Sequence, residues 1–271
     1  MWYWTKILFL ILVGAVLVWL TYELVTFPSI AKLRTENPAT TSLIEYRLAQ
    51  ARKENREPRK YMIWQPIEQI SPHLQRAVLA GEDTRFFQHD GFDWDAINKV
   101  WEEARRETEK EAKAENDNDA ENYIPPLDRK GFLEYIWENF GVPSPDHFTR
   151  GASTISQQLT KNLYLSEERS FLRKGREAVY TYYLERDLQK KRILEIYLNV
   201  IEWGDGVYGA EAAARTYFNK SASQLTPQEA AYLSAMIPSP LNVFNPKKNP
   251  KRVQRRARVI QRGMNYVKLP Y

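Results

Sequence analysis

Residues 7–20 constrain the chain most, because they form an uninterrupted apolar run without a charged side chain. With the residues on either side, the run reaches about the 20 residues that a helix needs to cross a bilayer. Small residues that would mark a cleaved signal peptide do not follow it, and a buried soluble helix is the other alternative. The run predicts a transmembrane anchor at residues 1–24. Aromatic residues flank it as interfacial belts do; they are Trp2, Tyr3, Trp4, Trp19 and Tyr22.

The composition narrows the classes of function. A chain of 271 residues has room for an anchor with one sizeable domain or two small ones. The net charge of +5 favours an anionic partner, and nucleic acid, anionic lipid or a phosphorylated substrate would fit. Cysteine is absent from the sequence, which excludes disulfides and thiol nucleophiles. The three histidines are widely spaced, which argues against a histidine metal site; they are His73, His89 and His147.

Residues 79–91 place two adjacent carboxylates, Glu82 and Asp83, between an apolar helical pattern and a pair of aromatic residues. Aromatic walls strip water from a carboxylate, and a neighbouring carboxylate repels its charge. Both effects raise a carboxyl pKa toward values useful for a base at neutral pH. In the structural alternative, the two acids pair with Arg85 and His89 around a helix end. The stretch alone leaves both interpretations open.

A second signal begins at Thr154, which forms a capping box with the glutamine three residues later. A helix that starts here has free amides and a positive dipole end, which suit an anion. Four polar side chains fall on one face of that helix, namely Thr154, Gln157, Gln158 and Lys161. Amides with one ammonium suit a sugar that carries a phosphate. The alternative is a helix face that is merely polar.

A third group combines cations with a carboxylate. Arg169, Arg173 and Lys174 follow the second signal, and Glu177 lies four residues after Arg173. The structural alternative is an Arg173–Glu177 pair within one helix, worth a few tenths of a kcal/mol. In the functional interpretation the cations hold a pyrophosphate. Glu177 then faces Glu82, and two carboxylates are the usual equipment for chemistry at a sugar anomeric carbon.

Local start signals predict a mainly helical chain, since no convincing alternating strand pattern appears. Ser71 with Pro72 starts the helix that ends at Glu82, and Asp93 caps a helix over residues 94–114. A further helix is expected at residues 41–54, and long helical material at 173–201. Thr226 opens another capping box. Apolar residues near the C-terminus predict a helix packed on one face and solvated on the other; they are Val253, Ala257, Ile260 and Met264.

Residues 102–121 carry nine acids against four bases, so they are expected to form a solvated helical extension or a flexible loop. This acidic stretch leaves the remainder of the chain strongly basic. The most basic segment is residues 247–262. Contact of that segment with anionic lipid is the alternative to simple solvation of its polar face.

The three signals belong to five motifs that follow one another along residues 60–265. The motifs are Glu82-Asp83-x-x-Phe86-x-x-His89-x-Gly91, Gly151-x-Ser153-Thr154-x-x-Gln157-Gln158-x-x-Lys161-Asn162, Arg173-Lys174-x-x-Glu177, Lys191-Arg192-Ile193-Leu194-Glu195-x-Tyr197-Leu198-Asn199 and Gly206-x-x-Gly209-x-x-x-Ala213-x-x-x-Tyr217-Phe218-x-Lys220. With them the chain resembles the peptidoglycan glycosyltransferase family, which class A penicillin-binding proteins share with monofunctional transglycosylases. Transpeptidase motifs are absent from the sequence, so the resemblance is to the monofunctional biosynthetic type.

The resemblance implies a mainly α fold, with a lysozyme-like large lobe and a smaller membrane-proximal lobe after the transmembrane helix. The expected parts are the anchor at 1–24, a connector at 25–59 and a glycosyltransferase domain at 60–271. The charged insertion at about 102–135 is longer than is usual in the family. The resemblance also implies a bacterial inner-membrane protein with a single span and a periplasmic catalytic domain. Lys6, before the apolar run, agrees with a cytoplasmic N-terminus.

The resemblance further implies the reaction. A growing glycan strand on a lipid pyrophosphate is transferred to the 4-hydroxyl of lipid II, with inversion to a β-1,4 link and release of the polyprenyl pyrophosphate. Glu82 is implied as general base and Glu177 as the second catalytic glutamate. The implied substrate-binding residues are Arg150, Ser153, Thr154, Gln157, Gln158, Lys161, Arg169, Arg173 and Lys174. The implied structural residues near the site are Asp83, Phe86, His89, Gly91 and Asn162.

No cofactor and no protein metal site are expected, and Mg or Mn at the pyrophosphate is left open. The expected partners are lipid II, the growing glycan strand and membrane lipid. Other cell-wall synthesis or division proteins are left open as partners, and nucleic acid is not expected. Two other functions stay open at this point. One is a glycan-cleaving lytic enzyme that uses the same carboxylates, and the other is an inactive membrane-anchored cell-wall scaffold.

Overall fold

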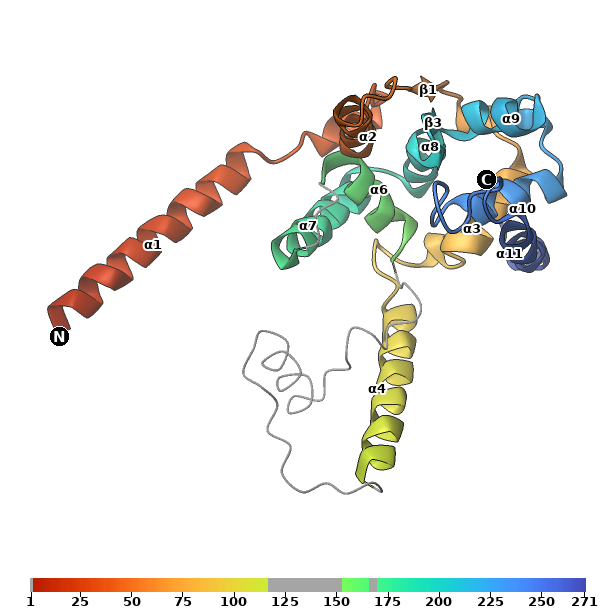
Figure 1. Cartoon of the computed structure of the whole chain (residues 1–271). Coiled ribbons are helices and arrows are strands. Elements are labelled where there is room, and N and C mark those ends of the chain that lie inside the picture. The colour runs from red at the N-terminus through yellow and green to blue at the C-terminus, as the bar shows by residue number, and fades with distance from the viewer. Residues whose placement is uncertain (1, 117–152, 166–169) are drawn as a thin grey trace.

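The computed structural model describes residues 2–116, 153–165 and 170–271, and these are mainly helical, as predicted (Figure 1). The α-helices are α1 (Trp2–Val25), α2 (Ser42–Lys53), α3 (Pro72–Glu82), α4 (Trp94–Asn116), α6 (Ile155–Tyr164), α7 (Phe171–Asp187), α8 (Lys190–Val200), α9 (Ala210–Phe218), α10 (Pro227–Met236) and α11 (Pro250–Gly263). The 3-10 helices are η1 (Ile30–Arg34), η2 (Ile67–Gln69), η3 (Phe86–Gln88), η5 (Ala222–Gln224) and η6 (Met264–Tyr266). The division into a large and a small lobe stays a prediction.

Helix α1 covers the predicted anchor and projects from the body of the molecule (Figure 1). At its base, Arg176 of α7 donates to Glu23 over 2.9 Å, and the Phe27 ring lies edge-on to Tyr180 at 5.2 Å. Across residues 2–116, 153–165 and 170–271, no helix combines the length and the apolar character that a membrane crossing requires. The predicted span at residues 1–24 is therefore not confirmed by the structure.

Most predicted helix starts are confirmed by their capping contacts. Thr41 accepts a hydrogen bond from the amide of Ile44 and begins α2, while Ser71 begins α3. The Asp93 carboxylate accepts from the amide of Ala96 over 2.9 Å at the start of α4. Such a cap satisfies an amide that has no partner within its own helix. These short-range contacts explain why sequence patterns located the helices well.

A small sheet was not predicted. Strand β3 (Val207–Tyr208) lies between β1 (Tyr61–Met62), which it pairs in parallel, and β2 (Glu202–Gly204), which it pairs in antiparallel fashion. Strands of two or three residues carry no alternating pattern that a sequence could reveal. Gly209 follows with φ +84°, and a Cβ there would lie 2.5 Å from the Asn199 carbonyl oxygen. The turn between the sheet and α9 thus requires glycine.

The predicted long helical material at 173–201 is interrupted. Helix α7 ends at Asp187 and α8 begins at Lys190, with Leu188 and Gln189 in extended conformation between them. Helix α6 packs against α2, α7 and α8. This arrangement sets the polar face of α6 beside the end of α3.

Helix α3 packs closely against α10 and α11. A Cβ added at Gly81 would lie 2.7 Å from the Ser234 hydroxyl of α10 and 3.0 Å from the end of the Ile260 side chain of α11. Val253, Ala257 and Ile260 are buried, which confirms the predicted amphipathic helix. The close approach at Gly81 brings α11 next to the last residue of α3, which is Glu82.

Candidate active site

Glu82 is the last residue of α3, and its side chain is only 8% exposed. Gln158 of α6 donates to its Oε2 over 3.0 Å, and Arg256 of α11 donates to its Oε1 over 3.0 Å. Burial raises the pKa of the Glu82 carboxyl; Arg256 and Gln158 lower it, and the neighbouring Asp83 raises it again. The net result is a raised pKa, in the direction that the sequence analysis expected for a carboxylate in such surroundings.

The amide of Gln158 is oriented by a third residue. The hydroxyl of Tyr197, on α8, donates to Gln158 Oε1 over 2.8 Å. The Tyr197 side chain is fully buried, and burial raises its pKa well above the usual range, so it stays protonated. A protonated hydroxyl on the carbonyl oxygen leaves the NH2 group of Gln158 to face Glu82. Three helices thus act on one carboxylate through a continuous chain of hydrogen bonds.

Asp83 joins the first two motifs. Its Oδ2 accepts from the amide of Ile155 over 3.0 Å, and His89 Nε2 lies 3.1 Å from its Oδ1. The anion at the start of α6 is therefore a carboxylate of the protein itself, favoured there by free amides and the helix dipole. The sequence predicted a helix start that suits a ligand anion; in the structure the Ile155 amide instead binds Asp83. Asp83 and His89 shape the loop, as expected.

Thr154 and Gln157 lie in the cap of α6. The capping box is present, and the Thr154 amide donates to Gln157 Oε1 over 3.0 Å. The Thr154 hydroxyl donates to the Gly91 carbonyl over 2.6 Å. Both side chains are buried, whereas Lys161 is partly exposed and Ser153 is exposed. Of the four side chains predicted on one face, Thr154 and Gln157 thus form the cap, and Gln158 donates to Glu82.

Glu177 is buried in α7 and paired within its own helix. Arg173 donates to its Oε2 over 2.9 Å, and the Lys174 ammonium contacts its Oε1. The side chain of Arg173 is largely buried, while that of Lys174 is about half exposed. The intrahelical pair that the sequence left open as an alternative is therefore present. Arg150 and Arg169 were also predicted in this region and lie outside the described residues.

The remaining motif residues support the loop around Glu82. Phe86 is buried, with the Lys190 ammonium 4.5 Å from the centre of its ring. Gly91 has φ +90°, and a Cβ there would lie 2.9 Å from the Thr181 methyl group. Asn162 is partly exposed on α6. The hydrogen bonds of Asp83 and Gly91 and the close approach at Gly91 hold residues 83–91 against α6 and α7.

Comparison of the sequence with known proteins shows the family of this chain. A family model described as Transglycosylase matches residues 48–112 and 125–265. The chain belongs to the transglycosylase family. A biosynthetic peptidoglycan transglycosylase of Chromobacterium violaceum is 40% identical over 98% of this chain and 100% of its own length. Proteins of the same name from Laribacter hongkongensis and Dechloromonas aromatica are 39% and 41% identical, covering 93% and 88% of this chain and 93% and 85% of theirs.

Membership of the transglycosylase family confirms the resemblance read from the five motifs, and with it the class of peptidoglycan glycosyltransferase. Sequence reasoning missed two contacts of the site. Tyr197 was noted within a motif but not as the partner of Gln158, and Arg256 was assigned to a solvated helix face. The signal for Arg256 was its place between Val253 and Ile260, three and four residues from buried positions.

Within the described ranges, the structure holds no group of three or more acids and histidines suited to a metal ion.

Proposed function

We propose that this member of the transglycosylase family polymerises lipid II into β-1,4-linked glycan strands. The observation that carries the proposal is Glu82, a nearly buried carboxylate with a raised pKa at the end of α3. A carboxylate of this kind is suited to accept a proton near neutral pH. The relatives named biosynthetic peptidoglycan transglycosylase support a substrate from peptidoglycan synthesis.

In the proposed step, Glu82 accepts the proton of the 4-hydroxyl of lipid II. The oxygen then bonds to the anomeric carbon of the donor, the bond from that carbon to the pyrophosphate breaks, and the configuration inverts. Glu82 Oε1 accepts a hydrogen bond from Arg256, and Oε2 accepts one from Gln158. Since a carboxylate oxygen has two lone pairs, each keeps capacity for the substrate proton.

The donor side of the proposal rests on cations and on the family motifs. Lys161, Arg173 and Lys174 would hold the leaving pyrophosphate together with Arg150 and Arg169. Glu177 would keep the nearest cations in place, since it accepts from both Arg173 and Lys174. Positive charge beside a leaving pyrophosphate stabilises the transition state. The proposal requires no cofactor; an assay with and without EDTA decides whether Mg or Mn accompanies the pyrophosphate.

We also propose that residues 1–24 attach the enzyme to the bacterial inner membrane, with the remaining chain on the periplasmic side. The support is the uncharged run at residues 7–20 and the exposure of apolar side chains along α1. Exposed apolar surface in water costs about 25 cal/mol per Å². A protease-protection assay tests this arrangement, and digestion of residues 30–271 from the cytoplasmic side contradicts it.

The deciding experiment incubates the full chain with lipid II and scores glycan polymer by gel. Wild type should produce polymer, and Glu82→Gln should lower the rate by about 10²–10⁴, the usual contribution of a general base. Glu68→Gln removes an exposed acid of η2 that pairs with Lys191; it is the matched control and should behave as wild type. Polymerisation by Glu82→Gln at the wild-type rate contradicts the base assignment. Shortening of added glycan without polymer would favour a lytic enzyme, and no reaction would favour a scaffold.

A further inference from the structure

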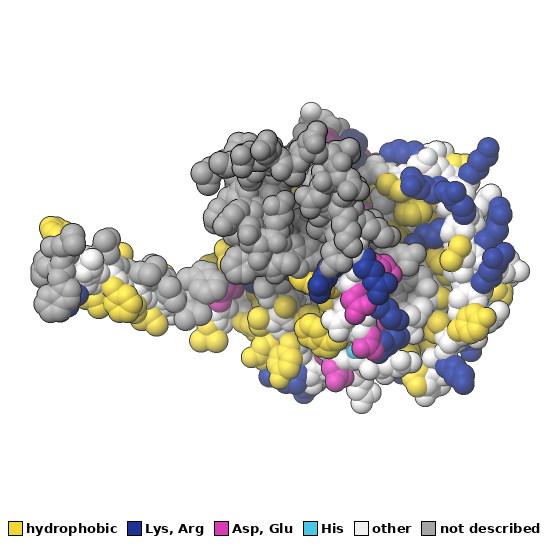
Figure 2. Space-filling view, turned by 90° about the horizontal axis from the view of Figure 1, so that it is seen from below, with side chains coloured by type: hydrophobic (Ala, Val, Ile, Leu, Met, Phe, Trp, Pro, Cys, Tyr) yellow, Lys and Arg dark blue, Asp and Glu magenta, His cyan; other side chains and the backbone are white. Residues whose placement is uncertain are grey.

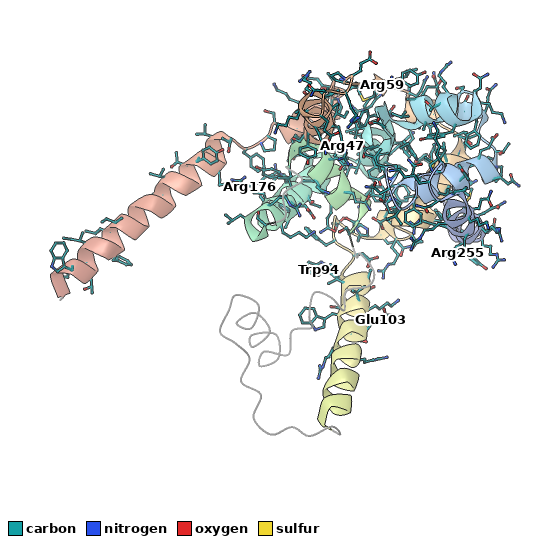
Figure 3. The ribbon with its side chains drawn as sticks, in the orientation of Figure 1. Arg47, Arg59, Trp94, Glu103, Arg176 and Arg255 are labelled. Carbon is teal, nitrogen blue, oxygen red and sulfur yellow. The ribbon has the colours of Figure 1, made fainter. Side chains whose placement is uncertain are left out.

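One cation of α11 differs from the other basic residues of that helix. Lys and Arg side chains gather on the side of the molecule where α11 lies (Figure 2), and Arg255 extends from the outer part of that helix (Figure 3). Five basic residues of α11 are exposed, namely Lys251, Arg252, Arg255, Arg258 and Arg262. Arg256 instead has a side chain that is 30% exposed and reaches α3. Arg256 therefore does not belong to the solvent-exposed basic face of α11.

The contacts of Arg256 tie its guanidinium to the end of α3. Its Nη2 donates to the Gly81 carbonyl and to Glu82 Oε1, each over 3.0 Å. The guanidinium also lies over the ring of Phe244 at 5.4 Å, a cation–π contact that restrains the side chain. One nitrogen thus binds two successive residues. This arrangement sets the direction of the Glu82 carboxylate relative to its own backbone.

The Nε atom of Arg256 differs from Nη2 in its contacts. It is buried and has no hydrogen-bond partner among the described residues. The two hydrogen bonds of the guanidinium to the end of α3 are therefore both made by Nη2, to Gly81 and to Glu82.

We propose that Arg256 is a positioning residue that aims Glu82 and keeps its carboxylate ionised between turnovers. The inference rests on the proposed role of Glu82 as general base. The other groups that face Glu82 are Gln158 from α6 and Asp83 from the loop after α3, with Tyr197 from α8 behind Gln158. His89 contacts Asp83 and not Glu82 in the described structure. Of these groups, Arg256 is the one that brings positive charge to Glu82.

The positive charge of Arg256 opposes the effect of burial on the Glu82 carboxyl. A base buried too deeply holds its proton at neutral pH and cannot accept another one. A guanidinium in contact favours the ionised form, and arginine stays charged at all relevant pH values. Loss of Arg256 should therefore raise the pKa of Glu82 further. The acidic limb of the pH profile should then move to higher pH.

The test compares Arg256→Gln with Arg255→Gln, which removes the same charge one residue away at an exposed position. Initial rates with lipid II are measured from pH 5 to 9 for wild type and both variants. Arg256→Gln should move the acidic limb of kcat/KM to higher pH, with about a tenfold loss at fixed acidic pH for each unit moved, and should recover rate at alkaline pH. Arg255→Gln should follow wild type. A profile lowered equally at every pH indicates a structural role and overturns the inference.

A second measurement does not depend on polymerisation. The Glu82 carboxyl is followed by carbon NMR with labelled glutamate, its signal assigned by absence in Glu82→Gln. It should titrate at higher pH in Arg256→Gln than in wild type, and the same titration in both proteins overturns the inference even if lipid II is not polymerised. Where Arg256→Gln does not fold, Arg256→Lys serves: its single ammonium cannot reproduce the guanidinium contacts, so a smaller move in the same direction is expected. Failure of wild type to polymerise, with the titration shift present, contradicts the proposed function alone.

Discussion

The two candidate catalytic glutamates are both buried, but the structure holds them by different means. Glu82 accepts from Gln158 and Arg256, which lie far away in the sequence on two other helices. Glu177 accepts from Arg173 and Lys174 of its own helix. The first carboxylate depends on the tertiary fold for its direction and charge, whereas the second depends on one helix. The contacts of Glu82 therefore depend on how three helices pack together, whereas the contacts of Glu177 depend on the cations of its own helix.

The largest expected effect comes from comparing Glu82→Gln with Glu177→Gln in polymerisation. Loss of the base should lower kcat by about 10²–10⁴. Loss of Glu177 should act on the donor side, since Arg173 and Lys174 lose their partner. A charged hydrogen bond is worth about 1.5–3 kcal/mol, which corresponds to roughly a 10- to 100-fold change in kcat/KM for the donor.

The pH profile of Glu177→Gln sharpens the same comparison. Residual activity in that variant should keep the acidic limb of wild type, because Glu82 is still the base. An acidic limb that follows Glu177 rather than Glu82 would exchange the two roles. Measuring kcat and KM separately across pH, with lipid II as sole substrate, distinguishes these outcomes.

The second expected effect concerns Asp83, which lies beside Glu82 but serves the fold. Asp83→Asn keeps the shape but removes the charge at the start of α6, and its NH2 group would face either the Ile155 amide or His89. One unsatisfied buried contact costs about 1–3 kcal/mol. A loss of 2 kcal/mol should lower Tm by roughly 4–8 °C in a domain of this size. Asp90→Asn, an exposed acid seven residues on, should leave Tm unchanged; equal Tm for the Asp83 and Asp90 variants contradicts the assigned contact.

The fold was predictable where its signals were local. Caps such as Ser71, Asp93 and Thr154 satisfy amides only a few residues away, so their pattern is visible in the sequence. The small sheet was not predictable, because its strands are too short for a pattern and β1 pairs with a strand far away in the sequence. The break at Leu188 was also missed, since the surrounding residues favour helix on both sides.

The sequence predicted which residues belong to the site, but not which of them contact one another. The motifs identified Glu82 and Gln158, yet their contact joins positions far apart in sequence. Thr154 and Gln157 were expected to face a ligand, and the cap that contains them explains their types equally well. Arg256 lies outside all five motifs. Its helical spacing from Val253 and Ile260 places it beside the buried face, but the sequence does not show that this face packs on α3 and reaches Glu82.

The smallest expected effect is the pH dependence of stability. The pKa of Glu82 is raised in the folded protein, so folding favours its protonated form. The stability from this group is fully present below the unfolded pKa and is lost as pH rises through the folded value. Glu82→Gln avoids that loss. Its Tm should therefore rise relative to wild type between about pH 5 and 8, where each 1 kcal/mol corresponds to roughly 2–4 °C.

An acid with the opposite shift provides the control for that measurement. The pKa of Glu68 is lowered, chiefly by its hydrogen bond with Lys191, so its stabilising contribution is present above the unfolded pKa and is lost as pH falls. Because Glu68 is exposed, the effect of Glu68→Gln should be within about 0.5 kcal/mol. Its Tm should fall slightly below wild type at neutral pH and meet it near pH 3. Parallel Tm curves for wild type and Glu82→Gln over pH 4–8 would remove Glu82 as a group that titrates in the folded protein, and with it the contrast to Glu177.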